Sequence, residues 1–117
     1  MLTARHQGRA FRLTGTGAFE ALFRDGRRSE GRRVQVVALS AAGIPGRVGY
    51  VIGRKTLPRA VDRNRLRRCL RETVRALRPS ISAFDVIVRV KRAGNRAEID
   101  AAVTEAGKLL ADLVARA

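Results

Sequence analysis

The segment from residue 54 to residue 78 combines a helical hydrophobic pattern with a very high positive charge. Its sequence is RKTLPRAVDRNRLRRCLRETVRALR, which holds ten basic and two acidic residues and contributes +8 to the net charge of +15. Apolar or small residues recur every three or four positions, which predicts an amphipathic helix with one buried face: Val61, Leu66, Cys69, Leu70, Thr73, Val74 and Leu77. The same spacing predicts a row of arginines in solvent: Arg63, Arg67, Arg68, Arg71, Arg75 and Arg78. Such a surface is typical of proteins that bind nucleic acid.

Length and overall charge limit the possible partners. A chain of 117 residues is long enough for one domain with its own core. An isoelectric point near 11.8 indicates an anionic partner. A membrane is not the expected one, because no apolar stretch approaches the roughly 20 residues of a spanning helix and the start lacks a signal peptide. The lone Cys69 cannot form an internal disulfide and is expected in the core, so we expect a cytoplasmic protein.

Catalytic and metal-binding patterns are missing from the sequence. His6 has no second histidine or cysteine at ligand spacing, so we expect no metal site in the protein. No nucleophile with a neighbouring base and no pair of carboxylates stands out, and we expect no catalytic residue. Asp62 and Glu72 lie among arginines, where they are expected to act as local charge partners.

We expect a basic N-terminal arm over residues 1–13 and a single RNA-binding domain over residues 14–117. A short helix is expected from Thr14 or Thr16 to about Arg24, with Gly26 ending it. The charged stretch from residue 25 to residue 33 is expected to be irregular. Two β-branched stretches, residues 34–39 and 48–53, are separated by a glycine- and proline-containing turn, which predicts an antiparallel hairpin.

The second half predicts the arginine-rich helix, a strand and a last helix. The arginine-rich helix should begin near Pro58 and end before Pro79, and a third strand follows with alternating apolar residues from Phe84 to Val90. Asn95 and Glu98 have the spacing of a capping box. The last helix has a net charge of −2 and a predicted buried stripe of Ile99, Val103, Ala106, Leu110 and Leu113. The order α-β-β-α-β-α predicts an α+β sandwich, with helices packed on a small sheet.

The arginine-rich segment also resembles a known signature. The string resembles the signature of the bacterial ribonuclease P protein subunit: Arg54-Lys55, then Ala60-Val61-Asp62-Arg63-Asn64-Arg65-Leu66-Arg67-Arg68, then Arg71-Glu72. The resemblance continues more loosely from Phe11 to Leu113. It implies an α-β-β-α-β-α fold with a left-handed βαβ crossover, an exception to the usual handedness.

The resemblance implies an accessory protein of a ribonucleoprotein endonuclease that removes the 5′ leader of precursor tRNA. The RNA subunit and its Mg²⁺ ions would carry the chemistry. The implied partners are ribonuclease P RNA and precursor tRNA, without DNA, a membrane or an obligate protein partner.

Two groups of site residues follow from the resemblance. Contacts with the catalytic RNA are implied for Arg63, Asn64, Arg65, Arg67, Arg68 and Arg71. Contacts with the leader are implied for Phe19, Phe23, Arg54, Lys55 and Arg12. A core position for both phenylalanines, and a merely solvated face for Arg67, Arg75 and Arg78, stay open. Val37 stands where one branch of the family places an aromatic residue, which puts stacking at that position in doubt.

Three other protein classes are alternatives to this interpretation. A ribosomal protein would share the size and charge. A helix-turn-helix DNA regulator would need two helices joined by a short turn, whereas strands are predicted on both sides of the arginine-rich helix. An independent nuclease would need a metal cluster or an acid pair.

Overall fold

The computed structural model describes residues 16–41 and 46–116. In chain order these form α2 (Thr16–Asp25), β1 (Arg27–Glu30), β2 (Val34–Ser40), β3 (Val48–Ile52), α3 (Ala60–Ala76), the 3-10 helix η1 (Ser80–Ala83), β4 (Phe84–Val90) and α4 (Arg96–Ala115). The predicted α+β class and the three predicted helices are confirmed, and one additional strand is present. None of the helices in the described part of the chain is long and apolar enough to cross a membrane.

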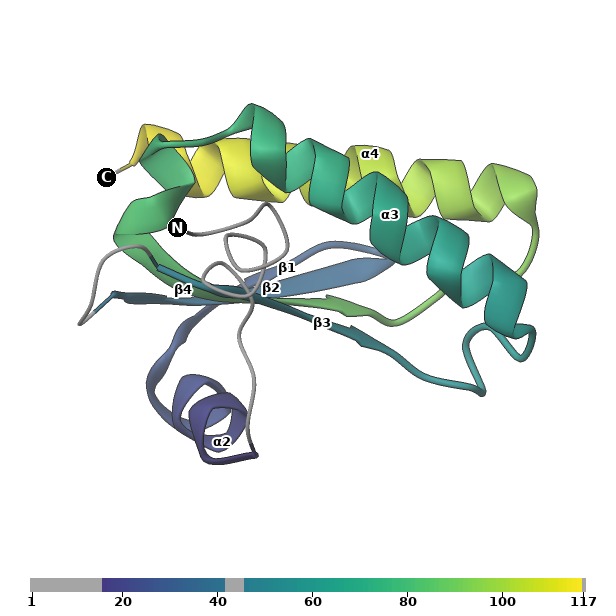
Figure 1. The fold of residues 1–117 in the computed structure, drawn as a ribbon, viewed down its shortest axis with the longest axis horizontal. Helices are drawn as coiled ribbons and strands as arrows, with labels where there is room; N and C mark the ends of the chain where they lie inside the picture. Colours follow the sequence, from purple (N-terminus) through teal and green to yellow (C-terminus); the bar gives the residue numbers. More distant parts are fainter. Residues whose placement is uncertain (1–15, 42–45, 117) are drawn as a thin grey trace, which may run out of the picture.

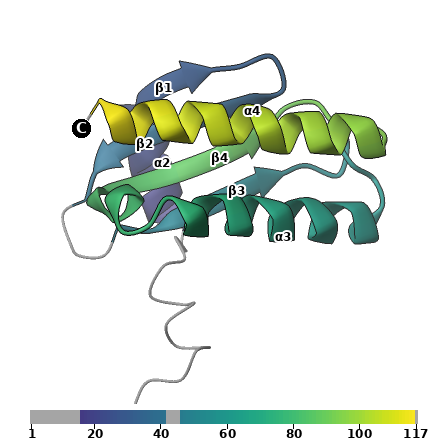
Figure 2. The same ribbon diagram turned by 90° about the horizontal axis from the view of Figure 1, so that it is seen from above.

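The four strands form one mixed sheet in the order β1-β2-β4-β3. β2 is antiparallel to β1 and β4, whereas β3 is parallel to β4. Figure 2 looks onto the sheet from the side of α3 and α4. When that view is turned so that the arrows of β3 and β4 point upward, β4 lies to the left of β3 and α3 passes in front. The β3–α3–β4 crossover is therefore left-handed, as the family resemblance implied.

The predicted hairpin between residues 34–39 and 48–53 is wrong. Both segments are strands, but β4 lies between them, with Val86 opposite Ala38 of β2 on one side and Val48 of β3 on the other. Alternation of apolar residues identifies a strand but not its neighbour, and the central position of β4 follows from burial on both of its faces.

The predicted irregular stretch of residues 25–33 is also wrong in part, because it contains β1. This edge strand has the sequence RRSE, and most of its side chains are exposed. A short, charged edge strand lacks the apolar alternation by which strands are recognised, and its charges protect the open edge from pairing with other chains.

Three helices cover the sheet unequally (Figure 1). α3 and α4 lie side by side on one face, and α2 runs across part of the opposite face. The larger core lies under α3 and α4 and includes Leu66, Leu70, Val74, Ile99, Ala102, Ala106 and Leu110 from the helices. The smaller core under α2 consists of Leu22, Val37 and Ile87, with Phe19, Phe23 and Val51 partly buried around it.

The predicted buried faces are confirmed in part: on α3, Leu66, Leu70 and Val74 are buried, whereas Cys69, Thr73 and Leu77 are half-buried. On α4, Ile99, Ala106 and Leu110 are buried, whereas Val103 and Leu113 are half-buried at the edge of the core. On α3, Val61 is 59% exposed and does not join the core. It lies in the first turn of the helix, beyond the end of the packed stripe that Leu66 begins.

Three local contacts hold the helices in these positions. The Gly26 N–H donates to the Leu22 carbonyl at 2.8 Å, and a β-carbon at Gly26 would lie 2.5 Å from that oxygen, so the predicted helix stop requires glycine. The Asn95 side chain accepts from the Glu98 N–H at 2.9 Å, which confirms the predicted cap of α4. The Glu105 carboxylate of α4 accepts the backbone N–H groups of residues 32, 33 and 34 at 2.9, 2.7 and 2.6 Å, and so ties α4 to the β1–β2 turn.

Candidate nucleic-acid interface

The arginines of α3, and Arg78 shortly after its end, differ in their exposure. Arg68, Arg71 and Arg75 are exposed, as the sequence predicts, whereas Arg63, Arg67 and Arg78 are half-buried. The predicted row in solvent is therefore wrong for these last three residues. The helix is flanked by α4 on one side and preceded by an ordered loop, and long side chains pack their methylene groups against such neighbours.

Arg63 stabilises the loop that precedes α3 through hydrogen bonds. Its Nη1 donates to the carbonyl oxygens of Leu57 at 2.7 Å and Pro58 at 2.8 Å. Leu57 is itself buried in the larger core, so this contact links the start of α3 to the loop between β3 and α3. Arg63 therefore has a structural role, and the RNA contact that the family resemblance implies for it stays a prediction.

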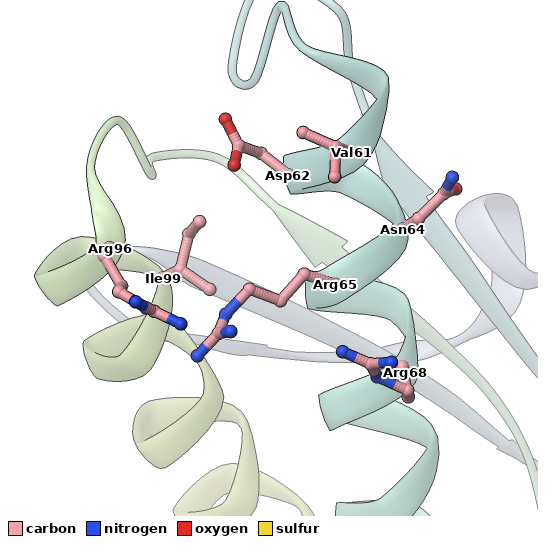
Figure 3. A pocket seen from close by; sticks show the side chains of 7 residues that line it. All are labelled: Val61, Asp62, Asn64, Arg65, Arg68, Arg96 and Ile99. Atoms are coloured by element: carbon pink, nitrogen blue, oxygen red, sulfur yellow. The ribbon is translucent and has the colours of Figure 1, made fainter.

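A hollow of about 440 Å³ lies between the first turns of α3 and α4 (Figure 3), and is called the α3–α4 hollow below. It is lined by Val61, Asp62, Asn64, Arg65 and Arg68 from α3 and by Arg96 and Ile99 from α4. The guanidinium groups of Arg65 and Arg96 reach toward each other across it, while Asn64 points outward from α3 and away from α4. The hollow thus brings together three of the six residues predicted to contact catalytic RNA: Asn64, Arg65 and Arg68.

The charged groups around the α3–α4 hollow are weakly paired. The Nη2 of Arg65 lies 4.0 Å from the Oδ1 of Asp100, and the Nε of Arg59 lies 4.0 Å from the Oδ2 of Asp62. Both separations exceed the length of a charge-assisted hydrogen bond. The Nε of Arg65 is buried and has no hydrogen-bond partner among the described residues.

Arg96 is a residue that the sequence analysis missed. It lies outside the arginine-rich segment, as the first residue of a helix with excess negative charge, so no run of basic residues marks it. The capping position of Asn95 could have placed it in the first turn of α4, but not opposite α3.

The two phenylalanines predicted to contact the leader lie on the other face of the sheet. Phe19 and Phe23 are half-buried on α2, against Leu22, Val37 and Ile87. Each side chain therefore contributes to the smaller core and keeps part of its surface accessible. Val37 is fully buried beneath α2 and offers no surface for stacking.

The remaining predicted leader contacts lie elsewhere. Arg54 and Lys55 are exposed in the turn after β3, which is closed by hydrogen bonds from the Thr56 and Leu57 N–H groups to the Gly53 carbonyl at 3.1 and 3.0 Å. This turn lies at the end of an edge strand, shortly before α3. Arg12 and the predicted basic arm lie outside the described residues.

Tyr50 of β3 packs its ring against the larger core, under α3. Burial raises the pKa of Tyr50 to about 12, although the positive charges of Arg71 and Arg78 act in the opposite direction. Burial also lowers the pKa of Arg78. The hydroxyl stays protonated at neutral pH, near Arg71 of α3 and near Arg78, which follows the end of that helix.

Comparisons with known proteins agree on one family. The chain matches the family model described as Ribonuclease P over residues 8–114. It is 36% identical over 105 residues to the ribonuclease P protein component of Chromobacterium violaceum, covering 90% of this chain and 87% of the relative. Identity to the corresponding protein of Symbiobacterium thermophilum is 38% over 110 residues, covering 93% and 92%. The relative from Synechococcus sp. is 45% identical over 85 residues, which span 69% of this chain and 60% of that relative's length.

The fold is also similar to solved structures. The RNase P protein from Thermotoga maritima superimposes with a TM-score of 0.68 at 23% identity, covering 91% of this chain and 96% of that one. The Staphylococcus aureus RNase P protein gives a TM-score of 0.68 at 22% identity, covering 87% and 90%. At these identities the likeness concerns the fold alone. Together with the sequence relatives it leads to one conclusion: the chain belongs to the ribonuclease P protein family, which takes part in tRNA processing as the protein component of ribonuclease P.

Proposed function

We propose that this protein binds the catalytic RNA of ribonuclease P through α3, and the single-stranded 5′ leader of precursor tRNA through the α2 side of the sheet. The observation that carries the proposal is the separation of two chemically different surfaces by one sheet. Arginines gather on α3, whereas half-buried aromatic rings lie on α2, on the opposite face.

The α3 surface has the chemistry of a contact with folded RNA. Guanidinium groups form forked hydrogen bonds with phosphate oxygens, and Arg68, Arg71 and Arg75 are exposed for this purpose. Asn64 is exposed and projects from the helix, so its amide can both donate to and accept from a base edge or a ribose hydroxyl. Burial of Leu66, Leu70 and Val74 holds the helix as a rigid support for these side chains.

The α2 surface has the chemistry of a contact with single-stranded RNA. Aromatic rings stack on bases with little preference for sequence, which suits leaders of varied sequence. Phe19 and Phe23 retain accessible surface next to Val51, which is also only partly buried. Exposed Arg89 on β4 follows Val88, so its side chain lies on the α2 face and supplies a positive charge there.

The protein is proposed to contribute binding and not bond cleavage. No group of three or more His, Cys, Asp or Glu side chains within residues 16–41 and 46–116 could hold a metal ion. We therefore assign the Mg²⁺ ions of the reaction to the RNA subunit and the substrate, and no step to a protein-bound ion. Arginines on the protein would lower the repulsion between the two RNAs and so reduce the Mg²⁺ concentration that the RNA requires.

We also propose a cytoplasmic location and assembly with the RNA subunit without an obligate protein partner. A single cysteine that cannot form an internal disulfide suits a reducing compartment.

The test is cleavage of a precursor tRNA with a 5′ leader at low Mg²⁺ concentration. Protein alone, ribonuclease P RNA from the same organism alone, and both together would be compared. Cleavage at the mature 5′ end that requires both, or is strongly enhanced by the protein, is the expected result. No enhancement would refute the proposal, and cleavage by the protein alone would mean that it has its own active site.

A variant of the protein tests whether one of its acidic side chains takes part in the cleavage step. Asp62→Ala removes an acidic residue of α3 that is not assigned a chemical role. Cleavage by the reconstituted enzyme should persist at a saturating concentration of this variant. Loss of cleavage under saturating binding would contradict the assignment of catalysis to RNA.

A further inference from the structure

We propose that the α3–α4 hollow binds a phosphate group of the catalytic RNA, and that Arg96 of α4 completes a three-arginine site with Arg65 and Arg68 of α3. The inference rests on the proposed function and extends the RNA-binding surface from one helix to two. It concerns a residue outside the arginine-rich segment.

The first argument is the convergence of charge. Arg65, Arg68 and Arg96 line one hollow but belong to two helices, and α3 and α4 pack against each other at this point. Like charges held together destabilise a folded protein unless something offsets them. The two nearby carboxylates, on Asp62 and Asp100, lie at 4.0 Å from Arg59 and Arg65 and leave the hollow with excess positive charge. A phosphodiester supplies the missing negative charge.

The second argument is unused hydrogen-bonding capacity. The buried Nε of Arg65 has no hydrogen-bond partner among the described residues. Within the same part of the chain, neither Arg68 nor Arg96 makes a side-chain hydrogen bond or ion pair. A buried donor without a partner costs free energy, and a rotation of the Arg65 side chain would bring this N–H to a bound acceptor. Arginine forks match the oxygen atoms of a phosphate better than those of most other anions.

The third argument is the shape and lining of the hollow. Its volume of about 440 Å³ is more than a phosphate group needs and leaves room for an adjoining ribose. Val61, at 59% exposure an unusual apolar residue on this surface, stands at the rim, and buried Ile99 forms part of the wall. An exposed aliphatic side chain beside a phosphate site is suited to packing against a ribose ring.

The test measures the salt dependence of binding to ribonuclease P RNA between about 50 and 200 mM salt. We expect Arg96→Ala to weaken binding roughly fivefold to tenfold and to lower the slope of log K against log salt by about one. Arg116→Ala, which removes the same side chain at the other end of α4, is the matched control and should leave the slope unchanged. Circular dichroism would verify that both variants are folded.

Two outcomes separate this inference from the proposed function. If the wild-type protein does not bind the RNA, the proposed function fails. If the wild-type protein binds and Arg96→Ala behaves like Arg116→Ala, the proposed function stands and the phosphate site is refuted.

A second arm distinguishes RNA phosphate from free phosphate. Thermal unfolding is followed with inorganic phosphate or chloride at equal ionic strength. Stabilisation by phosphate that is lost in Arg96→Ala, together with the change in RNA salt slope, would support the site. The same loss without any change in RNA binding would overturn the assignment to RNA and leave a site for free anions only.

Discussion

The two faces of the sheet differ in the size of the buried core that the helices form on them. Under α3 and α4 the strands contribute Val36 and Val88 to a core with nearly all of the fully buried side chains. Under α2 the buried residues are Leu22, Val37 and Ile87, and the phenylalanines around them stay half-exposed. The first face is built for rigidity. The second keeps apolar surface accessible, which costs stability but leaves aromatic rings available for the proposed stacking on single-stranded RNA.

This difference has a consequence for the proposed function. Since the arginines of α3 belong to the rigid face, their backbone positions are fixed before the proposed binding, and only their side chains lose conformational entropy. The aromatic residues belong to the loosely covered face, which could adapt to the varied sequences of the proposed single-stranded ligand, the 5′ leader. Substitutions on one face should therefore leave the contribution of the other intact.

The largest expected effect concerns the stability of the two cores. Leu66→Ala in the larger core should lower the free energy of unfolding by about 3–4 kcal/mol, because its neighbours are packed on all sides and cannot collapse into the cavity. Leu22→Ala in the smaller core should cost only about 2 kcal/mol, since α2 can shift toward the sheet. Urea unfolding of both variants measures the difference. Equal losses in the free energy of unfolding would mean that α2 is packed as tightly as α3, and would contradict the difference between the two faces.

The sequence was sufficient to locate most elements because their signals are local. The stripe of Leu66, Leu70 and Val74, the alternation in β4 and the cap at Asn95 each depend on residues a few positions apart. Strand pairing depends on residues far apart. Nothing near residues 34–39 or 48–53 indicates that β4 separates them, and β1 is too short and polar to be recognised.

The candidate site shows the same limit. Resemblance identified Asn64, Arg65 and Arg68, and the structure brings these to one hollow. Arg96 was missed because it meets them only through the packing of α4 on α3. The loop contact of Arg63 was missed for a similar reason, since it depends on the path of the chain around Leu57. The acceptor role of Glu105 toward the β1–β2 turn joins residues more than seventy positions apart.

The next largest effect concerns the aromatic face. Phe19→Ala should weaken binding of leader-bearing precursor tRNA to the holoenzyme about tenfold, because one stacking surface is lost. Binding of mature tRNA, which has no leader, should be unchanged. Equilibrium binding of both tRNAs measures the ratio, with circular dichroism to verify folding. Equal weakening of binding to precursor and mature tRNA would mean that Phe19 has only a structural role.

A smaller effect distinguishes two arginines on α3. Arg63→Ala should lower the free energy of unfolding by about 1 kcal/mol, since the Leu57 and Pro58 carbonyl oxygens lose their donor. Exposed Arg68→Ala should leave stability nearly unchanged and weaken RNA binding more than Arg63→Ala does. Urea unfolding and RNA binding on the same preparations measure both quantities. A larger loss of RNA affinity in Arg63→Ala, without loss of stability, would contradict the structural task assigned to this residue.

The smallest expected effect concerns β1, the edge strand that pairs with β2. The Lys91 ammonium donates to the Glu30 carboxylate at 2.6 Å, the Gln35 amide also donates to it, and both contacts lower the pKa of Glu30 from its ordinary value of 4.5. A lowered folded-state pKa means that this carboxylate stabilises the fold above pH 4.5, and that the contribution is lost as the pH falls through the lowered value.

Lys91→Ala should therefore raise the pKa of Glu30 toward its ordinary value, whereas Lys108→Ala, which removes a lysine from the exposed side of α4, should not. Carbon-13 NMR titration of the Glu30 carboxyl measures the change directly. An equal rise in both variants would mean that the total positive charge of the protein lowers this pKa, and that the edge strand owes nothing to the Lys91 contact. A rise in the pKa of Glu30 only in Lys91→Ala would show that the contacts of Lys91 hold the end of β1. This edge strand has mostly exposed side chains, so little packing holds it in place.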